Sequence, residues 1–329
     1  MDKLKESHSK NILWVTDPWD QLIHDKETTL RWIQESVWLG QVSYWTDYRS
    51  IRIENEVTQL IAYPVLEAKE SLDTNCFKMG DPISVSATEF DQIHYRVDPP
   101  VNQHYLHPLQ MLALNTRDTQ TEFINPLEVL FLANEKFENF LLGKLTPPTL
   151  IATQKESFQA FFNEYQKVVI KPIFDARGRG TAVLDHKSKE DQSKFEKVLK
   201  NLTFGFTSPA LMQVYLNQIH DGEIRLWFLD GELLSSFKKF PMEGDFRVNV
   251  TGGSPIERYS LGSSDKKAVE KIGRLLKRRR IRLAAVDLIN GQCTDFNFTS
   301  PGLMVQMEAL YGENFSKIVL EKLTKPFSS

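Results

Sequence analysis

The pattern of apolar and polar positions at the start of the chain predicts a small α/β domain. Asn11–Thr16 is an apolar run that is typical of a buried strand. Residues 25–39 carry apolar side chains at helical spacing, and Gly40 follows them as a natural helix end. Residues 41–45 resume strand character. A strand, a helix and a second strand in this order predict a helix packed on a sheet.

Farther along, the pattern predicts several subdomains rather than one repeated unit. Residues 50–91 have a mixed β pattern, and residues 127–142 predict a helix. Pro147 and Pro148 then mark a break in the chain. There is no internal repeat, and the long gaps between the strongest motifs indicate subdomains that converge on one site.

A predicted hairpin near the C-terminal end carries three oxygen ligands. The apolar run 281–289 meets the turn pair Asn290-Gly291, and a second strand follows. Asp295 and Asn297 are two residues apart on that strand, so their side chains leave the same face of the sheet.

Asp287 joins that face in only one register. A three-residue loop over 290–292, with Gly291 at a positive φ, places Asp287 opposite Asp295. A two-residue loop would send Asp287 to the other face. Facing carboxylates repel each other unless a cation lies between them. Together with an amide oxygen they suit Mg²⁺ whose remaining positions are taken by phosphate oxygens. The alternative is that these residues only form the turn.

A candidate phosphate-binding segment spans residues 168–184, in which a β-branched strand, a loop with two glycines and another strand follow one another. Bare backbone N–H groups in such a loop can lie over phosphates, and Arg177 and Arg179 add positive charge. The loop lacks the Gly-Lys-Ser/Thr that opens a helix in a Walker loop. Lys171, inside the strand, costs free energy unless its ammonium meets an anion. An ordinary hairpin with an edge lysine is the alternative.

Two further stretches could hold parts of a nucleotide. Lys136, on the predicted helix 127–142, could reach an anion or lie on a solvated helix face. Residues 214–216 could flank a flat heterocycle, and Asp221 could accept a hydrogen bond from a ribose hydroxyl. Arg225 begins a strand just beyond them. The alternative is a core strand followed by an Asp-Gly turn.

Residues 238–253 form a charged, glycine-rich segment between two predicted strands. It holds Lys239, Arg247 and Asn249, and Gly252-Gly253 could act as a hinge. Such a segment could close over a reaction and exclude water, or it could be an ordinary surface loop. The basic run 277–280 lies at the end of a helical pattern, which favours a cationic helix C-terminus over a nucleic-acid patch.

Composition narrows the class of protein. The chain has 329 residues, 41% of them hydrophobic, which suits a large core divided among two or three domains. The net charge of −3 argues against a nucleic-acid binder that acts through bulk charge. Cys76 and Cys293 are too few for a disulfide framework, and no apolar run reaches the ~18 residues of a membrane span. We therefore expect a cytoplasmic protein that binds neither nucleic acid nor membrane.

Several short motifs run along nearly the whole chain in a distinctive order. They are RVDPP at 96–100, NEK at 134–136, IKP at 170–172, YL and DGE-x-R within 215–225, R-x-N at 247–249, Gly-Gly at 252–253 and D-x7-D-x-N-x-TSP at 287–301. In this order they resemble the motifs of the prokaryotic glutathione synthetases, a family of ATP-grasp ligases.

The resemblance implies an ATP-grasp fold of mixed α/β and α+β class with an N-terminal Rossmann-like domain. It implies a substrate-binding domain over residues 1–118, a central lid subdomain over 119–205 and a C-terminal catalytic subdomain over 206–329. The implied reaction joins γ-glutamylcysteine to glycine with ATP through an acyl phosphate, in a homo-oligomer. The alternatives are a related ligase with a different acid or amine, and a non-catalytic binder of nucleotide or peptide.

The resemblance also implies roles for individual residues. For ATP these are Lys136, Lys171, Asp175, Gly178, Gly180, Gln213, Val214, Tyr215, Leu216 and Asp221. For the substrates they are Arg96, Asp98, Asn249, Gly252, Gly253, Thr299 and Ser300. For catalysis they are Arg225, Lys239 and Arg247. For one or two magnesium ions, with manganese as an alternative, they are Asp287, Asp295 and Asn297.

Three positions depart from the family pattern. Asp295 stands where the family usually has glutamate, so the ligand is shorter by one methylene. Lys239 stands where the family tends to have an arginine, and the two are not equivalent at a bidentate carboxylate. Asn102 stands where an acid commonly follows Asp-Pro-Pro. These departures keep an altered substrate open as an alternative.

Overall fold

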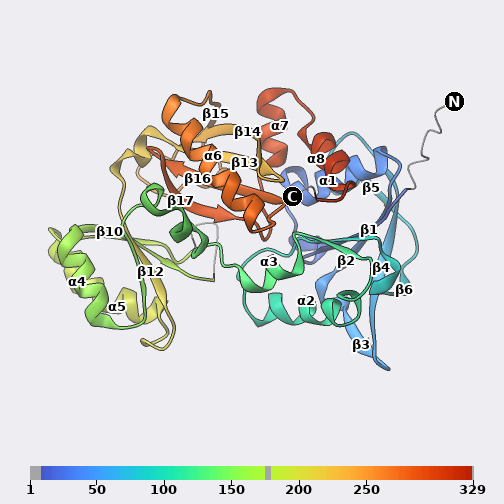
Figure 1. Ribbon diagram of the computed structural model, residues 1–329, viewed down its shortest axis with the longest axis horizontal. Helices are drawn as coiled ribbons and strands as arrows, with labels where there is room; N and C mark the ends of the chain where they lie inside the picture. The colour runs from blue at the N-terminus through green and yellow to red at the C-terminus, as the bar shows by residue number, and fades with distance from the viewer. Residues whose placement is uncertain (1–8, 175–178, 328–329) are drawn as a thin grey trace.

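The computed structural model describes residues 9–174 and 179–327, and within those residues the strands form three β-sheets (Figure 1). In the first sheet, β1 (Asn11–Thr16) runs parallel to β2 (Val42–Asp47) and to β7 (Gln92–Tyr95). β8 (Glu122–Ile124) extends the parallel part beside β7. The antiparallel part consists of β3 (Arg52–Glu54), β4 (Val57–Ala68), β5 (Phe77–Met79) and β6 (Ile83–Ser86).

Helices cover both faces of this first sheet. Ile12 and Trp14 of β1 share a core with α1 (Thr28–Trp38), and Leu13 and Val15 share another core with α2 (Gln103–Thr116). A parallel strand covered on both faces needs such a continuous apolar sequence. The predicted strand, helix and second strand are therefore confirmed, although the helix begins at Thr28 rather than at residue 25.

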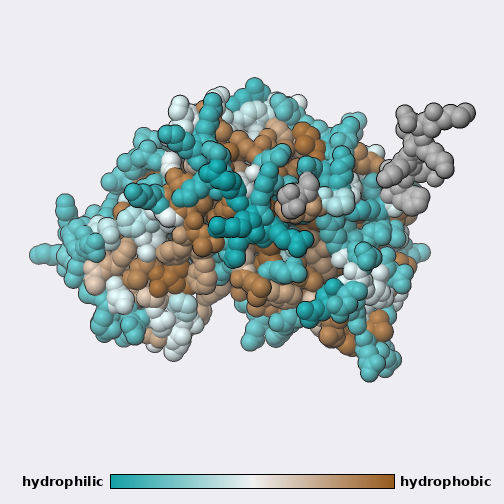
Figure 2. Space-filling model, viewed as in Figure 1, coloured by the Kyte–Doolittle hydropathy of each residue, from teal (hydrophilic) through white to brown (hydrophobic). Residues whose placement is uncertain are grey.

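The second sheet forms a separate lobe, at the left of Figure 1. Its strands are antiparallel, in the order β11 (Ala182–Asp185), β10 (Lys167–Pro172), β12 (Ala210–Val214) and β9 (Thr149–Ala152). α4 (Lys155–Tyr165) and α5 (Lys189–Leu202) supply the rest of its core. Figure 2 shows a notch in the outline of the molecule between this lobe and the part that contains α2.

In space, the third sheet lies between the other two sheets (Figure 1). Its order is β15 (Ile256–Arg258), β14 (Glu232–Lys239), β13 (Glu223–Leu229), β16 (Leu283–Ile289) and β17 (Gln292–Asn297). α6 (Ser263–Arg278) packs on one face, and the end of α6 coincides with the basic run 277–280. α7 (Met304–Tyr311) and α8 (Phe315–Leu323) then return to the first domain and contact α1.

Short 3-10 turns complete the described structure: η1 (Trp19–Gln21), η2 (His24–Lys26), η3 (Tyr48–Ser50), η4 (Ala87–Glu89), η5 (Glu138–Leu145) and η6 (Asn217–Asp221). Among the helices of residues 9–174 and 179–327, none combines the length and apolar character needed to cross a membrane. The expected mixture of α/β and α+β units is confirmed.

The helix predicted over residues 127–142 is wrong in its extent. α3 (Leu127–Leu132) ends before the Asn134 motif, and the chain becomes helical again only in η5. The Asn134 side chain accepts a hydrogen bond from Lys136 N at 2.8 Å, a local bond that competes with helix continuation. The non-helical segment lets Lys136 reach Asp295 on β17 and lets Glu135 reach the backbone just after β17.

Sheet membership also shifts the expected divisions of the chain. β8 belongs to the first sheet although it lies beyond residue 118, and β12 belongs to the second sheet although it lies beyond residue 205. Each expected division therefore precedes the strand that completes a sheet. Pairing with strands that are distant in the sequence decides to which sheet a strand belongs, and the local composition of the strand does not indicate this pairing.

A shared core joins the first domain to the third sheet. Trp32 of α1 packs edge-on against Trp227 of β13, with ring centroids 6.1 Å apart. Leu283 on β16 lies in the same cluster of buried side chains. Because this apolar contact is buried on both sides, the two domains are held in a fixed relation, and cavities between them have defined walls.

Arg282 also holds this junction together, through buried ion pairs and hydrogen bonds. Its side chain is 1% exposed and donates to Asp230 at 2.9 Å and to Glu122 on β8 at 2.5 Å. It also donates to the carbonyl oxygens of Lys322 and Lys325 at the end of α8. One guanidinium thus satisfies groups from the first sheet, the third sheet and the last helix.

We expect Arg282→Met to lower the free energy of unfolding by about 3–5 kcal/mol, because the substitution leaves buried carboxylate and carbonyl oxygens without a donor. Urea-induced unfolding measures the change. Arg278→Met is the matched control, since Arg278 is exposed and forms no ion pair with the described residues. An Arg282 variant as stable as this control would contradict a stabilising role for the Arg282 contacts.

Candidate active site

Two cavities meet at the third sheet. The first, about 990 Å³, opens between the second and third sheets, and the second, about 910 Å³, opens between the third sheet and the first domain. Four residues line both cavities: Arg225, Lys239, Val248 and Asn297. A group bound at this shared wall would be accessible from both sides.

The acidic hairpin has the expected facing residues but not the expected loop. Asn290 and Gly291 have φ values of +48° and +73° and form a two-residue turn between β16 and β17. A bulge at Thr294 then adds one residue to β17, so that Asp287 faces Asp295. The three-residue loop expected from the sequence is therefore wrong. The bulge, and not the loop, produces the expected pairing of Asp287 with Asp295.

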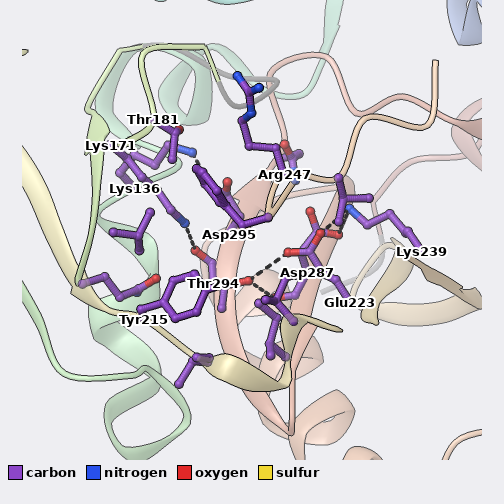
Figure 3. A pocket seen from close by; sticks show the side chains of 18 of the residues that line it. Lys136, Lys171, Thr181, Tyr215, Glu223, Lys239, Arg247, Asp287, Thr294 and Asp295 are labelled. Atoms are coloured by element: carbon purple, nitrogen blue, oxygen red, sulfur yellow. Dashed lines mark hydrogen bonds and ion pairs between the residues drawn. The ribbon is translucent and has the colours of Figure 1, made fainter. Parts of the chain in front are cut away.

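Protein cations lie beside the facing carboxylates (Figure 3). Asp287 accepts from Arg225 Nε at 2.9 Å and Nη2 at 2.7 Å, and from Lys239 Nζ at 3.0 Å. Asp295 accepts from Lys136 Nζ at 2.5 Å. Arg225 lies directly across the strand pair from Asp287, so the backbone register alone brings this pair together.

Burial and charge act in opposite directions on these groups. Burial raises the pKa of Asp287, but Arg225 and Lys239 outweigh it and hold that pKa well below its usual range. Burial lowers the pKa of Lys136, but Asp295 outweighs it and the net pKa is raised. The pKa of Lys171 is lowered, because burial is not fully offset by the more distant carboxylates.

Lys171 is the cation of the first cavity best suited to an incoming anion. Its ammonium donates to Thr294 O at 3.1 Å, and none of the ion pairs between described residues includes it. Lys136 lines the same cavity with its charge toward Asp295. A phosphate between Lys136 and Lys171 would relieve the free-energy cost of burying the Lys171 ammonium.

The end of the first cavity beside β12 is more apolar than the end that holds the charged residues. Gln213, Val214, Tyr215 and Leu216 all line it, where β12 ends. The Lys167 ammonium lies 4.3 Å from the centre of the Tyr215 ring, and Phe246 meets the same ring edge-on. This end offers stacking surfaces, whereas the opposite end offers charge.

The carboxylates fit a hard cation only in part. Asn297 Nδ2 donates to Ala285 O at 3.2 Å, which leaves Oδ1 available on the wall shared by the cavities. Asp295 uses one oxygen for Lys136, and its other oxygen has no partner among the described residues. Asp287 has both oxygens engaged by cations. Asp295 and Asn297 could therefore hold magnesium if phosphate oxygens completed its shell.

The second cavity contains four of the seven residues expected to bind substrates: Asp98, Asn249, Thr299 and Ser300. Gly252 and Gly253 lie outside its lining, and Gly252 N donates instead to Asn249 Oδ1. Arg96 lies outside it as well. The Arg96 side chain donates to Thr29 Oγ1 and Pro301 O and lies 4.7 Å from the Trp32 ring centre. Burial lowers the pKa of Arg96 to about 10.

Other expected residues lie apart from the first cavity. Asp221 is exposed in η6, and Gly180 has a φ of +68° but does not line the cavity. Asp175 and Gly178 lie outside the described residues. Arg247 lines the first cavity, but its guanidinium donates to Asp245 and points away from the central carboxylates (Figure 3).

Two carboxylates at this site are not predicted from the sequence. Glu223 accepts from Lys239 Nζ at 2.8 Å, and its position two residues before Arg225 on one strand could have revealed the shared face. Glu135 is 9% exposed and accepts from the backbone N–H groups of Phe298 and Thr299. No local pattern indicates that contact, which joins residues 163 apart in the chain.

We expect Asp287→Asn to lower the free energy of unfolding by about 3–5 kcal/mol at pH 7, because the buried guanidinium of Arg225 loses its counter-charge and Lys239 keeps only Glu223. The pKa of Asp287 is depressed by folding, so its stabilisation is present above the ordinary carboxyl pKa and is lost as the pH falls. The difference between wild type and variant should therefore shrink below about pH 4 in urea titrations.

Asp245→Asn is the matched control for this substitution. Asp245 pairs with Arg247, whose side chain is 55% exposed, so water screens the pair and little change in stability is expected. Equal losses for the two variants would contradict the buried role of Asp287.

Comparisons with known proteins agree over most of the chain. The family model for the prokaryotic glutathione synthetase N-terminal domain matches residues 11–130, and the one for the ATP-grasp domain of the same proteins matches residues 135–312. A glutathione synthetase of Neisseria meningitidis serogroup A is 28% identical over 294 residues, which cover 88% of this chain and 91% of that protein.

Solved structures share the fold at low sequence identity. D-cycloserine synthetase DcsG matches with a TM-score of 0.64 and 14% identity, over 95% of this chain and 100% of that chain. The ATP-grasp ligase PsnB, complexed with a precursor variant, Mg and ADP, matches with a TM-score of 0.59 and 16% identity, over 95% and 98%. The chain has the ATP-grasp fold and belongs to the prokaryotic glutathione synthetase family.

Proposed function

We propose that this protein is a ligase that joins γ-glutamylcysteine to glycine at the expense of ATP, through an acyl phosphate. The observation that carries the proposal is the wall of Arg225, Lys239 and Asn297 between two cavities of different character. A phosphoryl group must pass from a nucleotide to a carboxylate, and such a transfer needs both reactants at one cationic boundary. Membership of the glutathione synthetase family supports the same reaction.

In this proposal the first cavity holds ATP. Lys136 and Lys171 bind its phosphates, and the segment Gln213 to Leu216 with Phe246 flanks the adenine. Asp295 and Asn297 hold magnesium, whose charge neutralises the phosphate oxygens when it is bound. Lys171 supports the assignment most strongly, since burial lowers its pKa and no described carboxylate pairs with it.

The second cavity holds the acid substrate with its reacting carboxylate at the shared wall. Arg225 and Lys239 face the carboxylate and the phosphoryl group that is transferred to it, and they stabilise the charge that develops there. Their positions are fixed by Asp287 and Glu223, which accept from them at 2.7 to 3.0 Å. No residue of the wall needs to form a covalent bond with the substrate.

A second candidate function is a related carboxylate–amine ligase with a different acid or amine. Lys239 favours this alternative, because it replaces the arginine that the family tends to have and is locked between Glu223 and Asp287. A lysine presents a point charge where an arginine would present a bidentate fork, which alters how a carboxylate is held.

The test is phosphate release from Mg·ATP with γ-glutamylcysteine, with and without glycine, and mass spectrometry of the product. We expect glycine-dependent release and a product with the mass of glutathione. Release without dependence on glycine would support the alternative ligase. ATP binding without any release would contradict the proposed reaction and any ligase that shares its acid substrate, and would leave a non-catalytic binder or a ligase with a different acid.

We expect Asp295→Ala to raise the magnesium concentration needed for half-maximal turnover by at least about 10-fold, because it removes the ligand with a free carboxylate oxygen. Asp295→Glu is the matched variant, since it restores the length found in relatives and should keep magnesium-dependent turnover. Wild-type turnover and magnesium dependence in Asp295→Ala would contradict the assignment.

A further inference from the structure

Glu135 is a buried carboxylate with its two oxygens in different surroundings. Its Oε1 accepts three hydrogen bonds, from Phe298 N at 2.6 Å, Thr299 N at 2.8 Å and Thr299 Oγ1 at 2.9 Å. Its Oε2 accepts none from the described residues and is not enclosed by protein. Because Glu135 lines the second cavity and is only 9% exposed, Oε2 is open toward that cavity.

Glu135 also lies beside the wall where the two cavities meet. The next residue, Lys136, lines the first cavity and pairs with Asp295. The residues that hold Oε1 directly follow Asn297, which lines both cavities. An acceptor that reaches Oε2 from the second cavity would therefore lie near a carbonyl carbon activated at the wall.

The second cavity has positive charge at the shared wall and a carboxylate at Glu135, and this separation suits an amine bound at Glu135. Arg225 and Lys239 supply positive charge at the shared wall. Glu27 and Asp98 also line the cavity, but each has other interactions, and Glu27 accepts from Thr29 N at the start of α1. Glu135 is thus a buried carboxylate with an oxygen available for a bound ammonium group.

We propose that Glu135 receives the attacking amine of the acceptor substrate through Oε2 and takes a proton from it. This inference rests on the proposed ligase function. Burial raises the pKa of Glu135, in spite of the hydrogen bonds from Thr299 and the charge of Lys136, which makes its carboxylate a better proton acceptor.

The proton and electron balance of this step is complete. The acceptor enters as an ammonium group and gives one proton to Glu135, which becomes a neutral acid. The freed lone pair of the nitrogen forms a bond to the carbonyl carbon of the acyl phosphate. The bond between this carbon and the oxygen that bridges to phosphorus then breaks, and its electron pair leaves with the phosphate. The nitrogen loses a second proton to this phosphate, and Glu135 returns its own proton to solvent.

The test separates acyl-phosphate formation from attack by the amine. Glu135→Gln keeps an oxygen for the Phe298 and Thr299 donors but turns Oε2 into an amide that cannot accept a proton. We expect kcat/KM for glycine to fall by about 10²–10⁴-fold, because a positioned general base contributes this much. Hydroxylamine is largely uncharged at neutral pH and needs no base, so hydroxamate formation from γ-glutamylcysteine and Mg·ATP should continue at the wild-type rate.

Three outcomes would overturn the inference. They are equal losses of glycine ligation and of hydroxamate formation, a raised KM for γ-glutamylcysteine in the hydroxamate assay, and unchanged ligation of glycine. The second outcome would mean that Glu135 binds the acid substrate instead. Glu128→Gln, an exposed change on α3, is the matched control and should leave both rates unaltered. Wild-type protein that forms neither product would contradict the proposed ligation of γ-glutamylcysteine itself, whatever the variant does.

Discussion

The arrangement of the site depends on one buried carboxylate, Asp287, held between two cations on neighbouring strands. Arg225 donates to both oxygens of Asp287, and Lys239 forms an ion pair with one of them. The three side chains, on β13, β14 and β16, therefore hold one another in place. Removing any one partner would leave an uncompensated charge in the protein interior. The network therefore fixes the cations of the shared wall before any substrate binds, and a preorganised site costs no reorganisation during the reaction.

Features that depend on local periodicity could be read from the sequence. β1, the position of α1 and the same-face relation of Asp295 and Asn297 follow from alternation and helical spacing, and the structure confirms them. The register of Asp287 was expected for the wrong reason. The sequence pattern cannot distinguish a three-residue loop from a two-residue turn followed by a bulge, because both shift the pairing by one residue.

Contacts between distant segments could not be read in the same way. Glu135 meets Phe298 and Thr299 only because α3 ends early and the first domain packs on the third sheet. The motif that contains Arg96 suggested a ligand for substrate, yet its guanidinium joins α1 to the backbone at Pro301. A motif identifies residues that matter to a family, but only the packing around them shows which cavity, if any, they reach.

We propose that a carboxylate in the second cavity accepts the γ-phosphoryl group across the wall of Arg225 and Lys239. The most direct measurement uses γ-glutamylcysteine labelled with ¹⁸O in its reacting carboxylate, with mass spectrometry of the phosphate released during ligation. We expect one ¹⁸O atom in each released phosphate, because the carboxylate oxygen bonded to phosphorus leaves with it. Unlabelled phosphate formed together with ligated product would contradict transfer of the γ-phosphoryl group to this carboxylate.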